Sequence, residues 1–213
     1  MSAVLEQVAN WLWGAPLLVV LLGGGLCFAA YSRLAPLRYL RHAVGFRDTR
    51  QFFFDLADPA KRSREDLLGA LRAFSRYQAH AEVTLGLNFN EALQVTEVLG
   101  LEQREEDETG LRKMAAEIRN ELELACVVVH PVTSAACATK DGDWWALGPY
   151  VSQPKITTGA GDHFNAGFCA ARLCGFSPRS CLTLATCTSG YYVRTAQSPS
   201  PSQVVGLLRE VSR

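Results

Sequence analysis

The pattern of apolar and polar residues divides the chain into two unequal parts. Residues 11–32 form a run without any charged side chain, which matches the roughly 20 apolar residues that an α-helix needs to cross a bilayer. After residue 45 no run of this length recurs, and short apolar stretches alternate with amphipathic ones. The pattern therefore predicts one transmembrane helix near the N-terminus, followed by a globular part.

The flanking charges predict the orientation of the transmembrane helix. Glu6 is the only charged residue before the apolar run, and arginines follow the run at positions 33, 38, 41, 47 and 50. Because arginines close to a span favour the cytoplasmic side, we expect the globular part to lie in the cytoplasm. The alternatives are less favoured, since a cleaved signal peptide needs a basic N-terminus and a buried soluble helix would be weakened by Pro16 and the glycines at 23–25.

Beyond residue 45 the periodicity predicts alternating strands and helices. Short apolar runs predict strands over 51–56, 81–87, 124–130, 136–140 and 143–147. The last two flank an Asp-Gly pair, which predicts a hairpin. Apolar stripes and cap residues predict a helix that begins after Ser63 and further helices over 88–99, 111–122, 160–173, 179–195 and 202–211. Strands alternating with helices indicate an α/β fold, with a mostly parallel sheet covered by helices.

Composition and charge exclude several classes of protein. Lys and Arg together number 21, as do Asp and Glu, so the net charge is zero, whereas nucleic-acid-binding proteins carry a basic excess. Hydrophobic residues make up 48% of the chain, which indicates a globular rather than a disordered protein. The seven cysteines include no Cys-x-x-Cys pair, which fits a reducing compartment better than a disulfide scaffold.

Candidate chemistry is concentrated in residues 156–168, which read Ile-Thr-Thr-Gly-Ala-Gly-Asp-His-Phe-Asn-Ala-Gly-Phe. The small residues Gly159, Ala160 and Gly161 predict a turn that leads directly into a helix, where exposed amides would bind an anion such as phosphate. Asp162 lies on the first turn of that helix, where its carboxylate can accept the proton of an attacking hydroxyl. A simple helix cap is the alternative for a pattern this short.

The longer string from Thr157 to Gly167 resembles the C-terminal signature of the PfkB, or ribokinase, family of carbohydrate kinases. The resemblance covers about residues 50–213 and implies part of a ribokinase-like fold with ATP-dependent phosphoryl transfer to a sugar or nucleoside hydroxyl. It also implies an anion hole at Gly159, Ala160 and Gly161, with Asp162 as the catalytic base that contacts the substrate. The family's N-terminal, substrate-binding half has no counterpart in the sequence, so we expect a truncated kinase.

A second motif stands in the order that this family shows. Asn88-Phe89-Asn90-Glu91 resembles its Asn-x-x-Glu motif, which follows a strand and opens a helix. An amide and a carboxylate one turn apart share a helix face, and both can hold water molecules around Mg²⁺. The resemblance thus assigns Asn88 and Glu91 to nucleotide and Mg²⁺ binding, with the metal contact running through water. A capping box with Asn88 as N-cap and Glu91 at N3 is the alternative.

Two histidines have open interpretations. The family usually shows Thr-x-Gly after the strand that here ends at His130, and this chain has His130-Pro131-Val132-Thr133 instead. His130 is either a phosphate ligand or a histidine whose hydrogen bonds are satisfied at the strand end. His163 either faces the substrate or lies in solvent on the helix.

The first 45 residues resemble the first transmembrane segment of sodium:alanine symporters, on the string from Leu12 to Val44. We therefore expect a symporter-like transmembrane segment over 1–45 and a PfkB-type kinase portion over 46–213. Since a symporter needs many spans to build its substrate site, we do not expect transport by this chain. A symporter fragment with a foreign tail, or a non-catalytic fusion of the two segments, remains an alternative.

Overall fold

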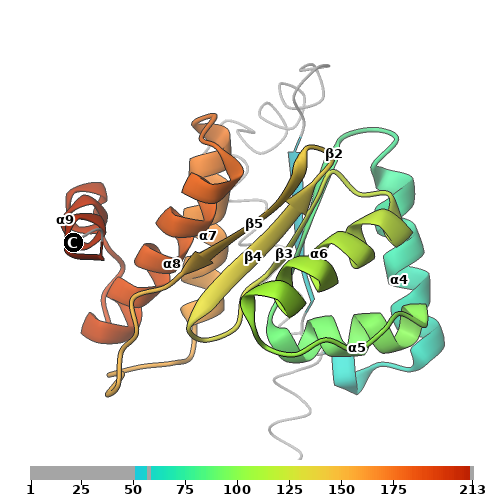
Figure 1. Ribbon diagram of the computed structural model, residues 1–213, viewed down its shortest axis with the longest axis horizontal. Helices are drawn as coiled ribbons and strands as arrows, with labels where there is room; N and C mark the ends of the chain where they lie inside the picture. The colour runs from blue at the N-terminus through green and yellow to red at the C-terminus, as the bar shows by residue number, and fades with distance from the viewer. Residues whose placement is uncertain (1–50, 57–58, 212–213) are drawn as a thin grey trace, which may run out of the picture. The chain divides into compact units, whose positions relative to one another are not determined.

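A computed structural model of the chain describes residues 51–56 and 59–211 (Figure 1). The predicted transmembrane helix over 11–32 and the symporter-like segment over 1–45 lie outside these residues. Within the described residues, no helix is both long and apolar enough to cross a membrane.

The described residues form one five-stranded sheet in the order β1-β2-β3-β4-β5. Its strands are β1 (Gln51–Asp55), β2 (Glu82–Leu87), β3 (Cys126–Val129), β4 (Ser134–Thr139) and β5 (Gly142–Leu147). The first three strands are parallel, whereas β4 runs antiparallel to both β3 and β5.

The sheet is therefore mixed, since β4 runs against the direction that the other four strands share, and the predicted mostly parallel sheet holds for those four. The reason lies in the connections. Only residues 130–133 join β3 to β4, and a parallel crossover needs a dozen residues or more. The predicted hairpin is confirmed, since β4 and β5 pair antiparallel across the turn that ends at Gly142.

Helices cover both faces of the sheet (Figure 1). On one face lie α4 (Arg64–Tyr77), α5 (Phe89–Leu99) and α6 (Glu108–Leu122), preceded by the short 3₁₀ helix η1 (Pro59–Lys61). On the other lie α7 (Ala160–Leu173) and α8 (Pro178–Thr195), with α9 (Pro201–Val211) packed on α8. The strands and helices predicted between residues 51 and 211 are thus all present, although α6 starts earlier than predicted because Asp107 caps it.

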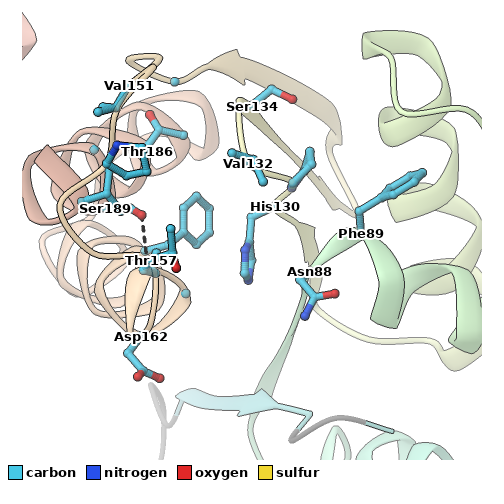
Figure 2. A pocket seen from close by; sticks show the side chains of 18 of the residues that line it. Asn88, Phe89, His130, Val132, Ser134, Val151, Thr157, Asp162, Thr186 and Ser189 are labelled. Atoms are coloured by element: carbon cyan, nitrogen blue, oxygen red, sulfur yellow. Dashed lines mark hydrogen bonds between the residues drawn. The ribbon is translucent and has the colours of Figure 1, made fainter. Parts of the chain in front are cut away.

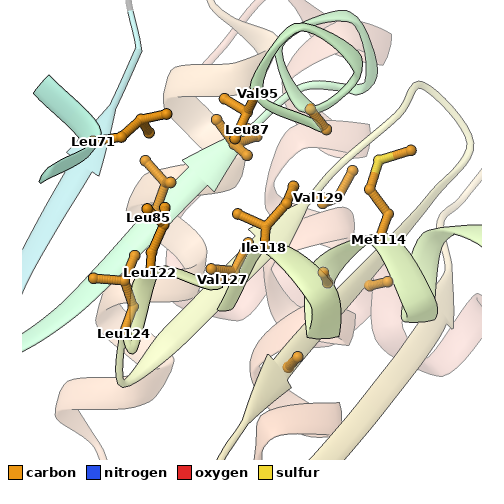
Figure 3. Close-up of a cluster of buried hydrophobic side chains, with 14 of the residues drawn as sticks. Leu71, Leu85, Leu87, Val95, Met114, Ile118, Leu122, Leu124, Val127 and Val129 are labelled. Carbon is orange, nitrogen blue, oxygen red and sulfur yellow. The ribbon is translucent and has the colours of Figure 1, made fainter. Parts of the chain in front are cut away.

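Alternation along the strands separates two hydrophobic cores. In β3, Val127 and Val129 face the α4–α6 side, where they pack with Leu85 and Ile118 (Figure 3). The intervening Val128 belongs to the second core, under α7 and α8. This period of two is what a strand buried on both faces requires.

Side-chain caps begin four of the helices and leave α7 as an exception. The side chains of Ser63, Asn88, Asp107 and Ser177 each accept a hydrogen bond from a backbone amide in the first turn of α4, α5, α6 and α8. Helix α7 has Gly159 as its N-cap residue and no side-chain cap. The first turn of α7 therefore keeps backbone amides that no side chain occupies.

Candidate active site

Three residues mark the edge at which the parallel strands end. Asp55 is the last residue of β1, Asn88 directly follows β2, and His130 directly follows β3. Open α/β sheets bind ligands in the crevice outside the carboxyl ends of their strands. All three residues line one cavity of about 610 Å³, which also reaches the N-terminus of α7 (Figure 2).

The residues predicted from the sequence meet at this cavity. Its lining includes all six of them: Asn88, Glu91, Gly159, Ala160, Gly161 and Asp162. Another part of the lining is largely apolar and comprises Val132, Pro149, Tyr150, Val151, Pro154 and Val193. The cavity therefore joins a polar end, at the strand termini and α7, to an apolar end beside α8.

The turn before α7 has the geometry of an anion site. Gly159 has a φ of +88°, a left-handed conformation that glycine adopts without steric cost. The amide of Ala160 donates to the carbonyl of Thr157 at 3.1 Å. Within the described residues, the amides of Gly161 and Asp162 have no acceptor. Of the predicted anion hole, Gly161 thus offers a free donor, Asp162 adds a second, and the Ala160 amide is used by the turn.

Helix α8 holds this turn in place. The Ser189 hydroxyl donates to the carbonyl of Ala160 at 2.9 Å (dashed in Figure 2), and the Tyr192 hydroxyl donates to the carbonyl of Thr158 at 3.1 Å. These contacts cross from α8 to the start of α7, so packing between two helices sets the position of the amides. Neither residue was predicted from the sequence, because nothing local to them signals a contact with the turn.

Asp162 lies at the rim of the cavity. Its side chain is exposed and projects from the first turn of α7, away from the apolar end (Figure 2). A carboxylate in this position is accessible to a second substrate that approaches the rim. It can accept a proton there while the α7 amides hold an anion deeper in the cavity.

Asp55 adds a second carboxylate, which was not predicted from the sequence as part of the site. Its Oδ2 accepts a hydrogen bond of 2.9 Å from the Nδ2 of Asn165 on α7. Burial raises the pKa of Asp55, and the neighbouring Asp162 carboxylate raises it further. The available signal was the position of Asp55 at the end of a short apolar run that predicts a strand.

Asn88 and Glu91 form the capping box that was the alternative interpretation of their motif. Asn88 Oδ1 accepts from the Glu91 amide at 2.9 Å, and Glu91 Oε2 accepts from the Asn88 amide at 2.9 Å. Both residues still line the cavity, so the cap fixes their side chains at its polar end. No group of three or more His, Cys, Asp or Glu side chains suited to a metal occurs in the described part of the chain.

The two histidines differ in their contacts. His163 stacks on Tyr192, with ring centroids 3.6 Å apart, and its Nδ1 donates to the Gly159 carbonyl at 2.8 Å. His163 therefore supports the turn, and it is not among the described residues that line the cavity. His130 stacks on Phe164 at 4.5 Å, and its Nε2 is buried with no hydrogen-bond partner in the described residues.

The fold is that of the ribokinase-like kinases. Phosphofructokinase-2 from Escherichia coli superimposes with a TM-score of 0.57 at 16% identity, over 83% of this chain and 62% of that one. A ribokinase from Thermotoga maritima gives 0.57 at 20% identity, over 80% and 52%. A ribokinase from Cryptococcus neoformans in complex with ADP gives 0.56 at 19%, over 83% and 56%.

The particular family follows from the sequence comparison. The family model of prokaryotic ketohexokinase matches residues 48–211, so the chain belongs to the prokaryotic ketohexokinase family, among the PfkB-type carbohydrate kinases. It is 25% identical over 146 residues to a ketohexokinase from Haloferax volcanii. The match covers 68% of this chain and 38% of that relative, so the chain spans less than half of its length. The predicted resemblance to PfkB kinases is thereby confirmed.

Proposed function

We propose that the chain transfers the terminal phosphoryl group of ATP to a hydroxyl of a ketohexose. The observation that carries this proposal is the first turn of α7, where two amides without acceptors adjoin the Asp162 carboxylate at the rim of the cavity. The family match and the curated relative support a ketohexose as the sugar. A ketohexose is one of the sugar or nucleoside acceptors that the sequence resemblance implies.

In the proposed reaction the α7 amides bind the phosphate that is transferred. Donors fixed before the reaction stabilise the charge that develops on the phosphoryl oxygens. Asp162 takes the proton of the sugar hydroxyl as its oxygen attacks the terminal phosphorus. The bond from that phosphorus to the bridging oxygen breaks, and the products are a sugar phosphate and ADP. The apolar end of the cavity suits the nucleobase.

The polar end of the cavity suits a Mg²⁺ ion that contacts the protein through water molecules. The described residues offer too few clustered ligands for a metal cage, but Mg²⁺ keeps several waters and binds substrate phosphates directly. Asn88 and Glu91 are held by their capping box on the cavity wall, where they would orient such waters. When bound, Mg²⁺ would neutralise charge on the phosphates.

The test is a kinase assay on the full chain with Mg-ATP and fructose, beside calorimetric ATP binding. Asp162→Asn should lower kcat by roughly 10²- to 10⁴-fold and leave the ATP Kd unchanged. An absence of ATP binding by the unaltered chain would overturn the proposal. Binding without transfer to any sugar would favour the non-catalytic alternative.

We also propose that residues 11–32 anchor the chain in a membrane, with the kinase portion in the cytoplasm. The support is the uncharged run and the arginines that follow it, together with the resemblance of residues 1–45 to a symporter span. After cell fractionation the chain should stay in the membrane pellet through an alkaline carbonate wash. Recovery in the supernatant without that wash would contradict the anchor.

A further inference from the structure

His130 has a ring nitrogen without a hydrogen-bond partner in the described residues, at the polar end of the cavity. Its ring projects from the end of β3 into the space between Asn88 and the start of α7 (Figure 2). The Nε2 atom is buried and has no hydrogen-bond partner in the described residues. Buried polar atoms in folded proteins nearly always have a partner, so an orphaned nitrogen beside a ligand cavity points to a partner on the ligand.

The ring lies beside the two amides that lack acceptors. It stacks on Phe164 of α7, and a Cβ placed on Gly161 would lie 3.7 Å from its Cε1 atom. Gly161 thus leaves room for the imidazole next to the first turn of α7. An anion held by the amides of Gly161 and Asp162 would lie within reach of the same ring.

The charges around the cavity show what kind of donor is needed there. The titratable side chains in its lining other than His130 and Tyr150 are the carboxyl groups Asp55, Glu91, Glu106 and Asp162, and no Lys or Arg among the described residues joins them. Burial lowers the pKa of His130 to about 4, so the imidazole is neutral at pH 7. Among the described residues, phosphate would therefore be bound by backbone amides and neutral side chains, together with a metal ion, and a neutral imidazole with its proton on Nε2 is such a donor.

We propose that Nε2–H of His130 donates a hydrogen bond to a phosphate oxygen of the bound nucleotide, beside the amides of Gly161 and Asp162. The inference rests on the proposed function, and it adds a phosphate-binding residue where the family's usual Thr-x-Gly is replaced.

The first test compares two ligands on the full chain. His130→Phe keeps an aromatic ring on Phe164 and removes Nε2. It should weaken Mg-ATP binding about tenfold, which corresponds to about 1.4 kcal/mol, and leave adenosine binding unchanged. His130→Gln, which restores an N–H donor, should recover part of the loss. His80→Phe is the matched control, because His80 is exposed and lies outside the cavity lining.

Equal weakening of ATP and adenosine binding would assign a structural role to His130 and overturn the inference. So would unchanged ATP binding with a raised KM for the sugar, because His130 would then contact the acceptor. If the unaltered chain binds neither ATP nor adenosine, the proposed function fails instead.

A second test needs no variant that might misfold. In ¹⁵N-labelled full chain at fixed pH, adding Mg-ATP should shift the Nε2 resonance of His130 and show the proton on Nε2. Adenosine should cause no such shift. A His130 ring that keeps its proton on Nδ1 with ATP bound would contradict donation from Nε2.

Discussion

The hydroxyl of Tyr192 on α8 donates a 3.1 Å hydrogen bond to the carbonyl of Thr158, one residue before Gly159, the N-cap residue of α7. A Cβ on Gly159 would lie 3.2 Å from the same hydroxyl. The tyrosine hydroxyl therefore binds the turn, and it also occupies the space beside Gly159 that a larger side chain at position 159 would need. Since the amides of α7 follow directly, α8 positions the groups that we propose bind phosphate.

Tyr192→Phe should consequently loosen the turn without emptying the space beside it. A hydrogen bond of this kind contributes about 0.5–1.5 kcal/mol net, so we expect the ATP Kd to rise roughly 2- to 10-fold. Calorimetry on the full chain would measure it. Tyr191→Phe is the control, because the Tyr191 hydroxyl makes no hydrogen bond within the described residues and its ring packs toward α9. Equal effects of the two substitutions would contradict a specific role for Tyr192.

Local signals in the sequence were sufficient for the helices and strands of the described part. Ser63, Asn88 and Ser177 act as N-caps because a short polar side chain reaches the amides of its own first turn. The glycine turn before Asp162 is local in the same sense. Elements and motifs that depend on a few neighbouring residues could therefore be predicted from the sequence.

Features that depend on distant contacts could not be predicted. The hydrogen bond between Asp55 and Asn165 joins β1 to α7, and the orphaned Nε2 of His130 results from burial by helix packing. The direction of β4 relative to β3 was not predicted, because strand alternation does not report how a connection turns. Periodicity fixes which face a side chain occupies, but not which remote residue meets it there.

The contact between α7 and α8 gives a prediction about stability. A Cβ on Gly167 would lie 2.7 Å from Thr188 Oγ1 and 3.0 Å from the Cα of Ala185. Because one of these atoms is backbone, Gly167→Ala should force the helices apart and cost about 1–3 kcal/mol. Thermal unfolding would measure the loss, and ATP affinity should fall with it, since α8 positions the turn.

The same substitution on α4 serves as the control for Gly167→Ala. Gly69 lies mid-helix, and a Cβ added there would meet no atom within 4 Å, so Gly69→Ala should stabilise the protein by about 0.5–1 kcal/mol. Opposite signs for the two variants are expected. A neutral or stabilising Gly167→Ala would show that the two helices pack less closely than the contacts at Gly167 indicate.

The pair of carboxylates at the polar end of the cavity predicts a pH dependence. Burial and the Asp162 charge raise the pKa of Asp55 above its ordinary value of about 3.9. The folded state therefore binds this proton more tightly than the unfolded state does. The stability that Asp55 contributes is present below pH of about 3.9 and is lost as the pH rises through its raised folded pKa.

Asp55→Asn removes that loss and keeps an oxygen that can accept from Asn165. The Asp55→Asn variant should thus have a higher free energy of unfolding than the unaltered chain, and this difference should increase from pH 4 to pH 7. Denaturant unfolding at each pH would measure it. In an Asp162→Asn background the increase should shrink, because one of the two causes of the raised pKa is gone and burial alone remains. A gain that is the same at every pH would show that the pKa of Asp55 is not raised in the folded state. An increase of the same size in the Asp162→Asn background would show that the two carboxylates do not interact.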